Sequence, residues 1–220
     1  MNWDAAVIGA GPSGSFLGWK LAETGLKVII FEKSKFPRYK SCGGGLTKKA
    51  VELLPEGWQN LIEDHIESIL VTYKMEETAH LYFKNPLIFT TMRDKLDTWL
   101  ADFAVKSGAA VIEQTPVLDI EYSQGKFNIK TPSRSYTADV LIGADGPASI
   151  VYKKLPFNLK INYAKAYEAE VFVDKKFLQK QRSKIWLEYG LISRGYSWIF
   201  PKKKSLIHRK RYIPEKRHRC

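Results

Sequence analysis

The sequence predicts an α/β protein of two interleaved domains, one built on a βαβ unit and the other on a mostly antiparallel β-sheet. Residues 4–32 follow the order strand, glycine turn, helix, strand. Short strand-like runs separated by polar residues and proline occupy residues 66–91 and resume beyond residue 164. A helical period over 93–106 and further strands up to residue 143 lie between these runs, so neither domain is continuous.

We assign residues 1–65 and 93–160 to a Rossmann-type nucleotide-binding domain, because they contain the βαβ unit. Residues 66–92 and 161–201 then form part of a second, mainly β-sheet domain. Residues 202–220 hold nine Lys or Arg against one acid and few large apolar side chains, which predicts a disordered basic tail.

Composition limits the class of protein. The tail contributes +8 to the net charge of +12, so the body is only mildly basic and we expect no nucleic-acid partner. Two cysteines and four histidines without ligand spacing predict a reduced chain without a metal. No leader-like segment precedes the first strand, and no apolar run approaches the ~18 residues of a spanning helix. We expect a cytoplasmic protein, with peripheral contact at a membrane left open.

A glycine motif marks the first turn. Residues 9–14 read Gly-Ala-Gly-Pro-Ser-Gly, where glycines permit a tight turn and let N–H groups at the helix N-terminus approach a pyrophosphate. Glu32 ends the second strand, at the position from which a carboxylate bonds a ribose hydroxyl. The residues predicted to bind this part of a dinucleotide are Gly9, Gly11, Pro12, Ser13, Gly14, Glu32 and Lys33.

A second cluster, Gly143-Ala-Asp145-Gly146, ends an apolar strand and opens a helix, which adds backbone donors and a carboxylate. Two such sites indicate a long cofactor, although an ordinary Asp-Gly turn is the alternative. The pair resembles the nucleotide motif and the Asp-Gly motif of the FAD-dependent monooxygenase and reductase superfamily. That resemblance implies FAD as cofactor, with Gly143, Asp145 and Gly146 at the pyrophosphate and ribityl chain.

The loop at residues 36–46 reads Phe-Pro-Arg-Tyr-Lys-Ser-Cys-Gly-Gly-Gly-Leu and resembles the Pro-Arg-x-Lys-x-Cys-Gly-Gly segment of the geranylgeranyl reductase family. The resemblance places Arg38, Cys42, Gly43, Gly44 and Gly45 beside the flavin or adenosine portion, and Arg93 on the cofactor side. For Cys42 we favour an inert small residue over a redox role, since no second cysteine is nearby in sequence. For Arg93 the alternative is a solvated charge at a helix start.

Residues 195–202 match the family's Tyr-x-Trp-x-Phe-Pro signature. Tyr196, Trp198 and Phe200 alternate along a strand and therefore share one face. That face suits the wall of an apolar substrate pocket, and one side of a sheet core is the alternative.

The resemblance covers residues 1–204 and implies an FAD-dependent enzyme that reduces carbon–carbon double bonds of a hydrophobic prenyl or isoprenoid lipid, with NADPH or another electron donor. No residue identifies itself as the proton donor. Two alternatives stay open. One is an FAD-dependent aromatic monooxygenase, which shares both nucleotide motifs, and the other is a non-catalytic fragment with a basic binding tail.

After Lys204 the resemblance ends. Family members continue into an apolar strand and a third FAD motif with a Gly-Asp pair, whereas residues 205–220 are basic. We expect a truncated member, produced by a frame shift at Lys202-Lys-Lys204 or by a premature stop. Such a chain is expected to be impaired in catalysis, and its binding of the flavin ring end is in doubt.

Overall fold

The computed structural model describes residues 2–157 and 160–214 and divides the chain into two compact units. The first comprises Met1–Tyr39 and Asp94–Leu159, and the second comprises Lys40–Arg93 and Lys160–Cys220. The predicted α/β fold class is confirmed, with a mixed sheet built on four parallel strands in one unit and a mostly antiparallel sheet in the other. The boundaries differ from the prediction, because residues 40–65 belong to the second unit.

The first unit contains a six-stranded sheet in the order β8-β2-β1-β11-β10-β9. Its strands are β1 (Asn2–Ile8), β2 (Val28–Phe31), β8 (Ala110–Ile112), β9 (Asp119–Ser123), β10 (Lys126–Lys130) and β11 (Ser135–Gly143). The first four neighbours in that order are parallel, and β10 and β9 are antiparallel additions. Since the chain moves outward from β1 to β2 and β8 and then returns beside β1 as β11, the order reverses between β1 and β11. Ligands of open α/β sheets bind at such a reversal.

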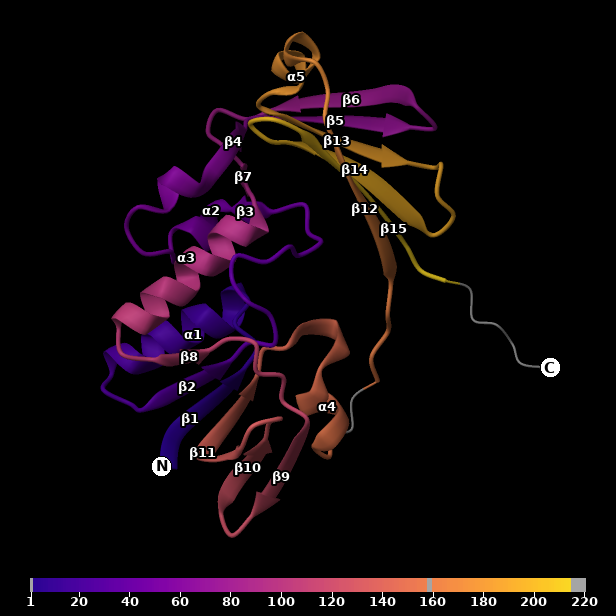
Figure 1. The fold of residues 1–220 in the computed structure, drawn as a ribbon. Helices are drawn as coiled ribbons and strands as arrows, with labels where there is room; N and C mark the ends of the chain where they lie inside the picture. The colour runs from indigo at the N-terminus through magenta and orange to yellow at the C-terminus, as the bar shows by residue number, and fades with distance from the viewer. Residues whose placement is uncertain (1, 158–159, 215–220) are drawn as a thin grey trace, which may run out of the picture. The chain divides into compact units, whose positions relative to one another are not determined.

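Apolar side chains of β1 alternate between the two faces of this sheet. Ala5 and Val7 pack with Trp19 of α1 (Pro12–Glu23) on one face, where α3 (Arg93–Lys106) also lies (Figure 1). Ala6 and Ile8 pack on the other face, in a cluster that includes Val151 of α4 (Ile150–Lys154). A 3-10 turn, η2 (Gly146–Ala148), leads into α4. Burial on both faces therefore fixes the carboxyl end of β1, where the glycine turn begins.

The second unit contains a six-stranded sheet in the order β12-β15-β14-β13-β5-β6 and a three-stranded sheet in the order β3-β7-β4. Among the described neighbours of the larger sheet, only β13 and β5 run parallel. The strands are β3 (Gly45–Thr47), β4 (Ile62–Ile66), β5 (Ser68–Tyr73), β6 (Glu76–Tyr82), β7 (Ile88–Thr91), β12 (Lys165–Val171), β13 (Lys184–Tyr189), β14 (Gly195–Pro201) and β15 (Leu206–Tyr212). Short helices α2 (Lys48–Val51), η1 (Trp58–Leu61) and α5 (Lys175–Gln181) connect them.

The predicted disordered tail is wrong for the part of it that the structure describes. β15 pairs along its whole length with β12 on one side and β14 on the other, so the ladder satisfies its backbone groups. Leu206 and Ile207 are only 6% and 4% exposed, whereas Lys210 and Arg211 face solvent. Few apolar residues are enough here, because burial is confined to the start of the strand, while pairing on both edges satisfies the backbone of the whole strand. The rest of the predicted tail, residues 215–220, lies outside the described residues.

This placement of β15 predicts different losses of stability for two alanine substitutions in the same strand. Ile207→Ala removes a buried side chain, so it should lower the free energy of unfolding by about 2–5 kcal/mol. Arg211→Ala, a matched control at the exposed end of the same strand, should change that free energy by no more than about 0.5 kcal/mol. Urea unfolding monitored by circular dichroism measures both. Equal, negligible effects would mean that this segment is not part of the sheet.

Candidate functional site

The turn after β1 requires glycine at two positions. Gly9 has φ +99°, and an added Cβ there would lie 2.5 Å from the carbonyl oxygen of Ala144. A Cβ on Gly14 would lie 1.9 Å from the carbonyl oxygen of Gly9. Gly11 is the N-cap of α1, Pro12 is its first residue, and Ser13 is exposed, with no acidic side chain in the first turn. Because glycines form this turn and no acidic side chain lies in the first turn of α1, the positive N-terminal end of the helix is open to an anion.

Glu32, directly after β2, is 4% exposed and accepts three hydrogen bonds. The donors are the Ala10 N–H at 3.2 Å, the Ser34 N–H at 3.0 Å and the Arg38 Nη2 group at 3.2 Å. The Nη1 atom of Arg38 lies 2.9 Å from a carboxylate oxygen of Asp97, a fully buried residue of α3. Arg38 thus bridges two acids inside the first unit, which is an intramolecular role that the resemblance did not indicate.

Asp145 follows β11 and faces the same end of the sheet. Its Oδ2 atom accepts hydrogen bonds from the Ile150 N–H at 2.6 Å and the Val151 N–H at 3.4 Å, so the carboxylate caps α4. Gly146 has φ +77° and allows the reversal between strand and helix. Gly143 is a strand residue, and a Cβ there would lie 3.0 Å from the Val151 Cβ. This cluster therefore builds one wall of a site and packs α4 against β11.

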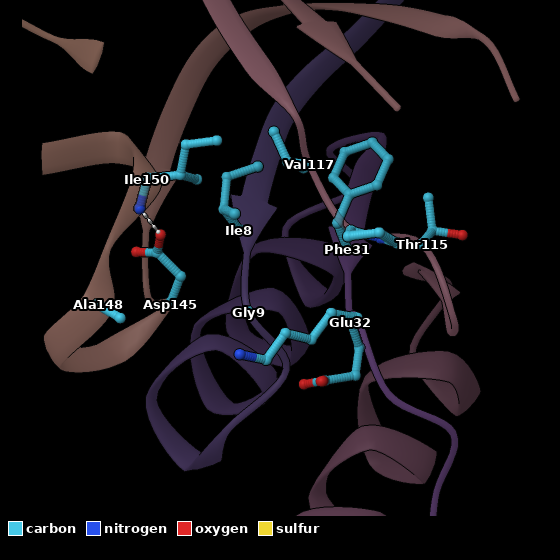
Figure 2. Close-up of a pocket in the computed structure, with 11 residues that line it drawn as sticks. Ile8, Gly9, Phe31, Glu32, Thr115, Val117, Asp145, Ala148 and Ile150 are labelled. Atoms are coloured by element: carbon cyan, nitrogen blue, oxygen red, sulfur yellow. Dashed lines mark hydrogen bonds between the residues drawn. The ribbon is translucent and has the colours of Figure 1, made fainter. Parts of the chain in front are cut away.

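A pocket of about 150 Å³ lies at the carboxyl ends of β1 and β2. Figure 2 shows Gly9 between Asp145 and Glu32, with Phe31, Val117 and Ile150 around the apolar part. Lys33 also lines it. Such a pocket can hold a flat ring between apolar side chains while carboxylates accept hydrogen bonds from hydroxyl groups.

A larger pocket of about 470 Å³ lies within the second unit. The structure brings together there two groups of predicted residues, the loop Cys42, Gly43, Gly44 and Gly45 and the side chains of Tyr196, Trp198 and Phe200. The ring centroids of neighbouring aromatic residues are 5.3 Å and 6.4 Å apart along β14. Ile185, Leu187 and Tyr189 of β13 complete an apolar wall, and Arg209 of β15 adds a cation.

The loop contacts the rings because it lacks side chains. A Cβ on Gly43 would lie 2.9 Å from the Trp198 Nε1 atom, and one on Gly45 would lie 2.7 Å from a ring carbon of Phe200. Cys42 is a half-buried free thiol whose sulfur accepts a hydrogen bond from the Gly44 N–H at 3.4 Å. Arg93 starts α3 at the boundary between the two units and lines neither pocket.

Sequence reasoning missed Lys202, which was assigned to the tail. This side chain is 1% exposed, and its ammonium donates to the carbonyl oxygens of Gly43 at 2.7 Å and Thr91 at 2.8 Å. Burial lowers the pKa of Lys202 to about 8, although the charges of Glu63, Cys42, Glu168 and Glu170 act in the opposite direction. The sequence offered one signal that Lys202 belongs to the site, which is that it directly follows the aromatic signature.

A glycine turn at the carboxyl edge of a parallel sheet, next to a strand-order reversal, defines a dinucleotide-binding protein of the Rossmann type. The family model described as an FAD binding domain matches residues 2–214. The chain therefore belongs to the FAD-binding domain family, within the FAD-dependent oxidoreductase superfamily.

Individual relatives confirm the resemblance to geranylgeranyl reductases. The chain is 32% identical over 201 residues to a protein of Methanosarcina barkeri, and 29% identical over 211 residues to a geranylgeranyl diphosphate reductase of Rhodobacter capsulatus. Each match includes 91% of this chain, which spans about half the length of the relatives, 51% and 52%. A geranylgeranyl bacteriochlorophyll reductase-like structure from Thermoplasma acidophilum has a TM-score of 0.80 at 23% identity, covering 96% of this chain and 57% of that one. Within the described residues, no helix has both the length and the apolar character needed to cross a bilayer.

The buried Lys202 predicts a pH-dependent stability. Below about pH 8 the ammonium is charged in both the folded and unfolded states, so its burial penalty applies in full. Between about 8 and 10.5 the unfolded chain binds more protons than the folded one, so the free energy of unfolding rises with pH. The free energy of unfolding of the wild type minus that of Lys202→Met should therefore increase across that range, as measured by urea unfolding. A constant difference would contradict the burial of a titrating ammonium.

Proposed function

We propose that this chain binds FAD and takes part in reducing carbon–carbon double bonds of a prenyl lipid. The single observation that carries the proposal is the pocket of about 470 Å³, where the glycine loop meets the aromatic face of β14. Both segments were singled out by their resemblance to the geranylgeranyl reductases. The named relative from Rhodobacter capsulatus supports the same substrate class.

The first unit would hold the adenosine end of the cofactor. The open N-terminus of α1 suits the pyrophosphate, and the smaller pocket offers apolar walls for adenine and the carboxylates of Glu32 and Asp145 for hydroxyl groups. Glu32 already accepts hydrogen bonds from Ala10 and Arg38, which fix its orientation before any ligand binds. The residues therefore fit FAD. When bound and reduced, FAD supplies the hydride for the reaction, and NADPH or another donor must restore the reduced flavin.

The second pocket would hold the prenyl chain. Branched hydrocarbon chains gain free energy by leaving water for apolar surface, and the walls are Ile69, Ile88, Ile185, Leu187 and the rings of Trp198 and Phe200. Saturation of each bond consumes one hydride and one proton, and no residue of the pocket is assigned as the proton donor.

A two-part experiment tests this function. The purified chain is titrated with FAD, and shifted flavin absorption bands on binding are expected. The complex is then reduced with dithionite under anaerobic conditions and supplied with geranylgeranyl diphosphate. Product mass should increase by two hydrogens for each saturated bond. Absence of flavin binding would refute the cofactor assignment, and oxygen-dependent hydroxylation of an aromatic substrate would favour the monooxygenase alternative.

Glu32 provides a residue-level prediction for the cofactor. Glu32→Ala should weaken FAD binding more than Glu32→Asp, because losing a charged partner of a hydroxyl costs roughly 1.5–3 kcal/mol. Quenching of flavin fluorescence gives both dissociation constants. Glu121→Ala serves as a control, because Glu121 is an exposed carboxylate of β9 in the same unit and lines neither pocket. Equal FAD affinity in the wild type and both Glu32 variants would remove Glu32 from the site.

A further inference from the structure

Lys202 joins three segments that surround the larger pocket. It follows the last residue of β14, it donates to Gly43 in the glycine loop, and it donates to Thr91 at the end of β7. Two further hydrogen bonds tie the same segments together. The Thr91 N–H donates to the Gly44 carbonyl at 2.8 Å, and the Thr90 hydroxyl donates to the Pro201 carbonyl at 2.9 Å.

These bonds decide which atoms of the loop face the pocket. The carbonyl oxygens of Gly43 and Gly44 are both engaged, by the Lys202 ammonium and by the Thr91 N–H. The positions that a side chain would occupy on Gly43 and Gly45 point at the rings of Trp198 and Phe200. The loop therefore presents glycine methylene groups to the aromatic face, while its carbonyl oxygens are held by polar partners.

Burying the Lys202 ammonium costs free energy, because the charge loses its contact with water. An ammonium that is 1% exposed loses its hydration, and the surroundings offset only part of that loss through two carbonyl dipoles and the acidic side chains of Glu63, Glu168 and Glu170. A short polar side chain at position 202 could not reach both carbonyls, and an apolar one could not donate to either. The requirement is for a long side chain with several N–H donors.

We propose that Lys202 is a positioning residue, whose buried ammonium holds the carbonyl groups of Gly43 and Thr91 and so shapes the glycine-loop wall of the aromatic pocket. It acts through the loop and does not itself line the pocket. The effect on the loop is independent of the ligand. The effect on prenyl binding rests on the proposed function.

The test replaces the side chain and then supplies its missing part. Lys202→Ala removes three methylene groups and the ammonium, and added propylammonium can restore all of them. Tetramethylammonium, which has charge but no N–H donor, is the control compound. Lys203→Ala is the control variant, because Lys203 is the exposed neighbour.

Two measurements separate the effect of Lys202 on the loop from its effect on ligand binding. Amide hydrogen exchange by mass spectrometry should accelerate about tenfold or more in residues 43–47 and 88–91 of Lys202→Ala, since hydrogen bonds to a charged donor are lost. Propylammonium should slow it again in a saturable manner, and tetramethylammonium should not. Quenching of tryptophan fluorescence by geranylgeranyl diphosphate should show a dissociation constant raised by about tenfold, which propylammonium restores and tetramethylammonium does not.

The outcomes are distinct. Unchanged exchange in Lys202→Ala, or equal changes in Lys203→Ala, would overturn the proposal. So would a Lys202→Ala chain that neither folds nor recovers with propylammonium, because Lys202 would then be a general structural residue. If the wild type fails to bind geranylgeranyl diphosphate, the proposed function fails, and the exchange readout still decides the role of Lys202.

Discussion

Backbone passes backbone so closely at Gly14 that a Cβ there would lie 1.9 Å from the Gly9 carbonyl oxygen. This contact sets the position of α1 on β1, and therefore where the helix N-terminus points. The same constraint recurs in the second unit, where Gly43 and Gly45 leave room for Trp198 and Phe200. In each unit a ligand-sized space exists because glycine removes a side chain where two elements meet.

Buried charges then hold the loops next to these glycines. In the first unit Arg38 links Glu32 to Asp97, and in the second unit Lys202 links Gly43 to Thr91. Removing one member of such a buried set leaves the others without a partner, which costs more than the contact itself is worth. In each unit, buried charged groups that the ligand need not touch hold the neighbouring loop in place. This favours a geometry that is formed before the ligand binds.

Local patterns were informative where the responsible interactions are short in range. The βαβ unit of residues 4–32 and the glycine turn follow from strand and helix periodicity and from the backbone freedom of glycine. The alternation of Tyr196, Trp198 and Phe200 likewise follows from strand geometry. By contrast, β15 was missed, because its stability comes from pairing with β12 and β14, and β12 begins more than forty residues away in the chain.

The sequence by itself determined the fold class, the family resemblance and the residues at the first turn, since these depend on periodicity and on motifs of adjacent residues. Only the tertiary structure decided that Arg38 bridges Glu32 and Asp97, and that Lys202 is buried beneath the glycine loop. The physical reason is that burial of a charge depends on partners from distant segments. Composition counts Lys202 as one of nine basic residues in a tail, and only the fold shows that two carbonyl groups receive its ammonium.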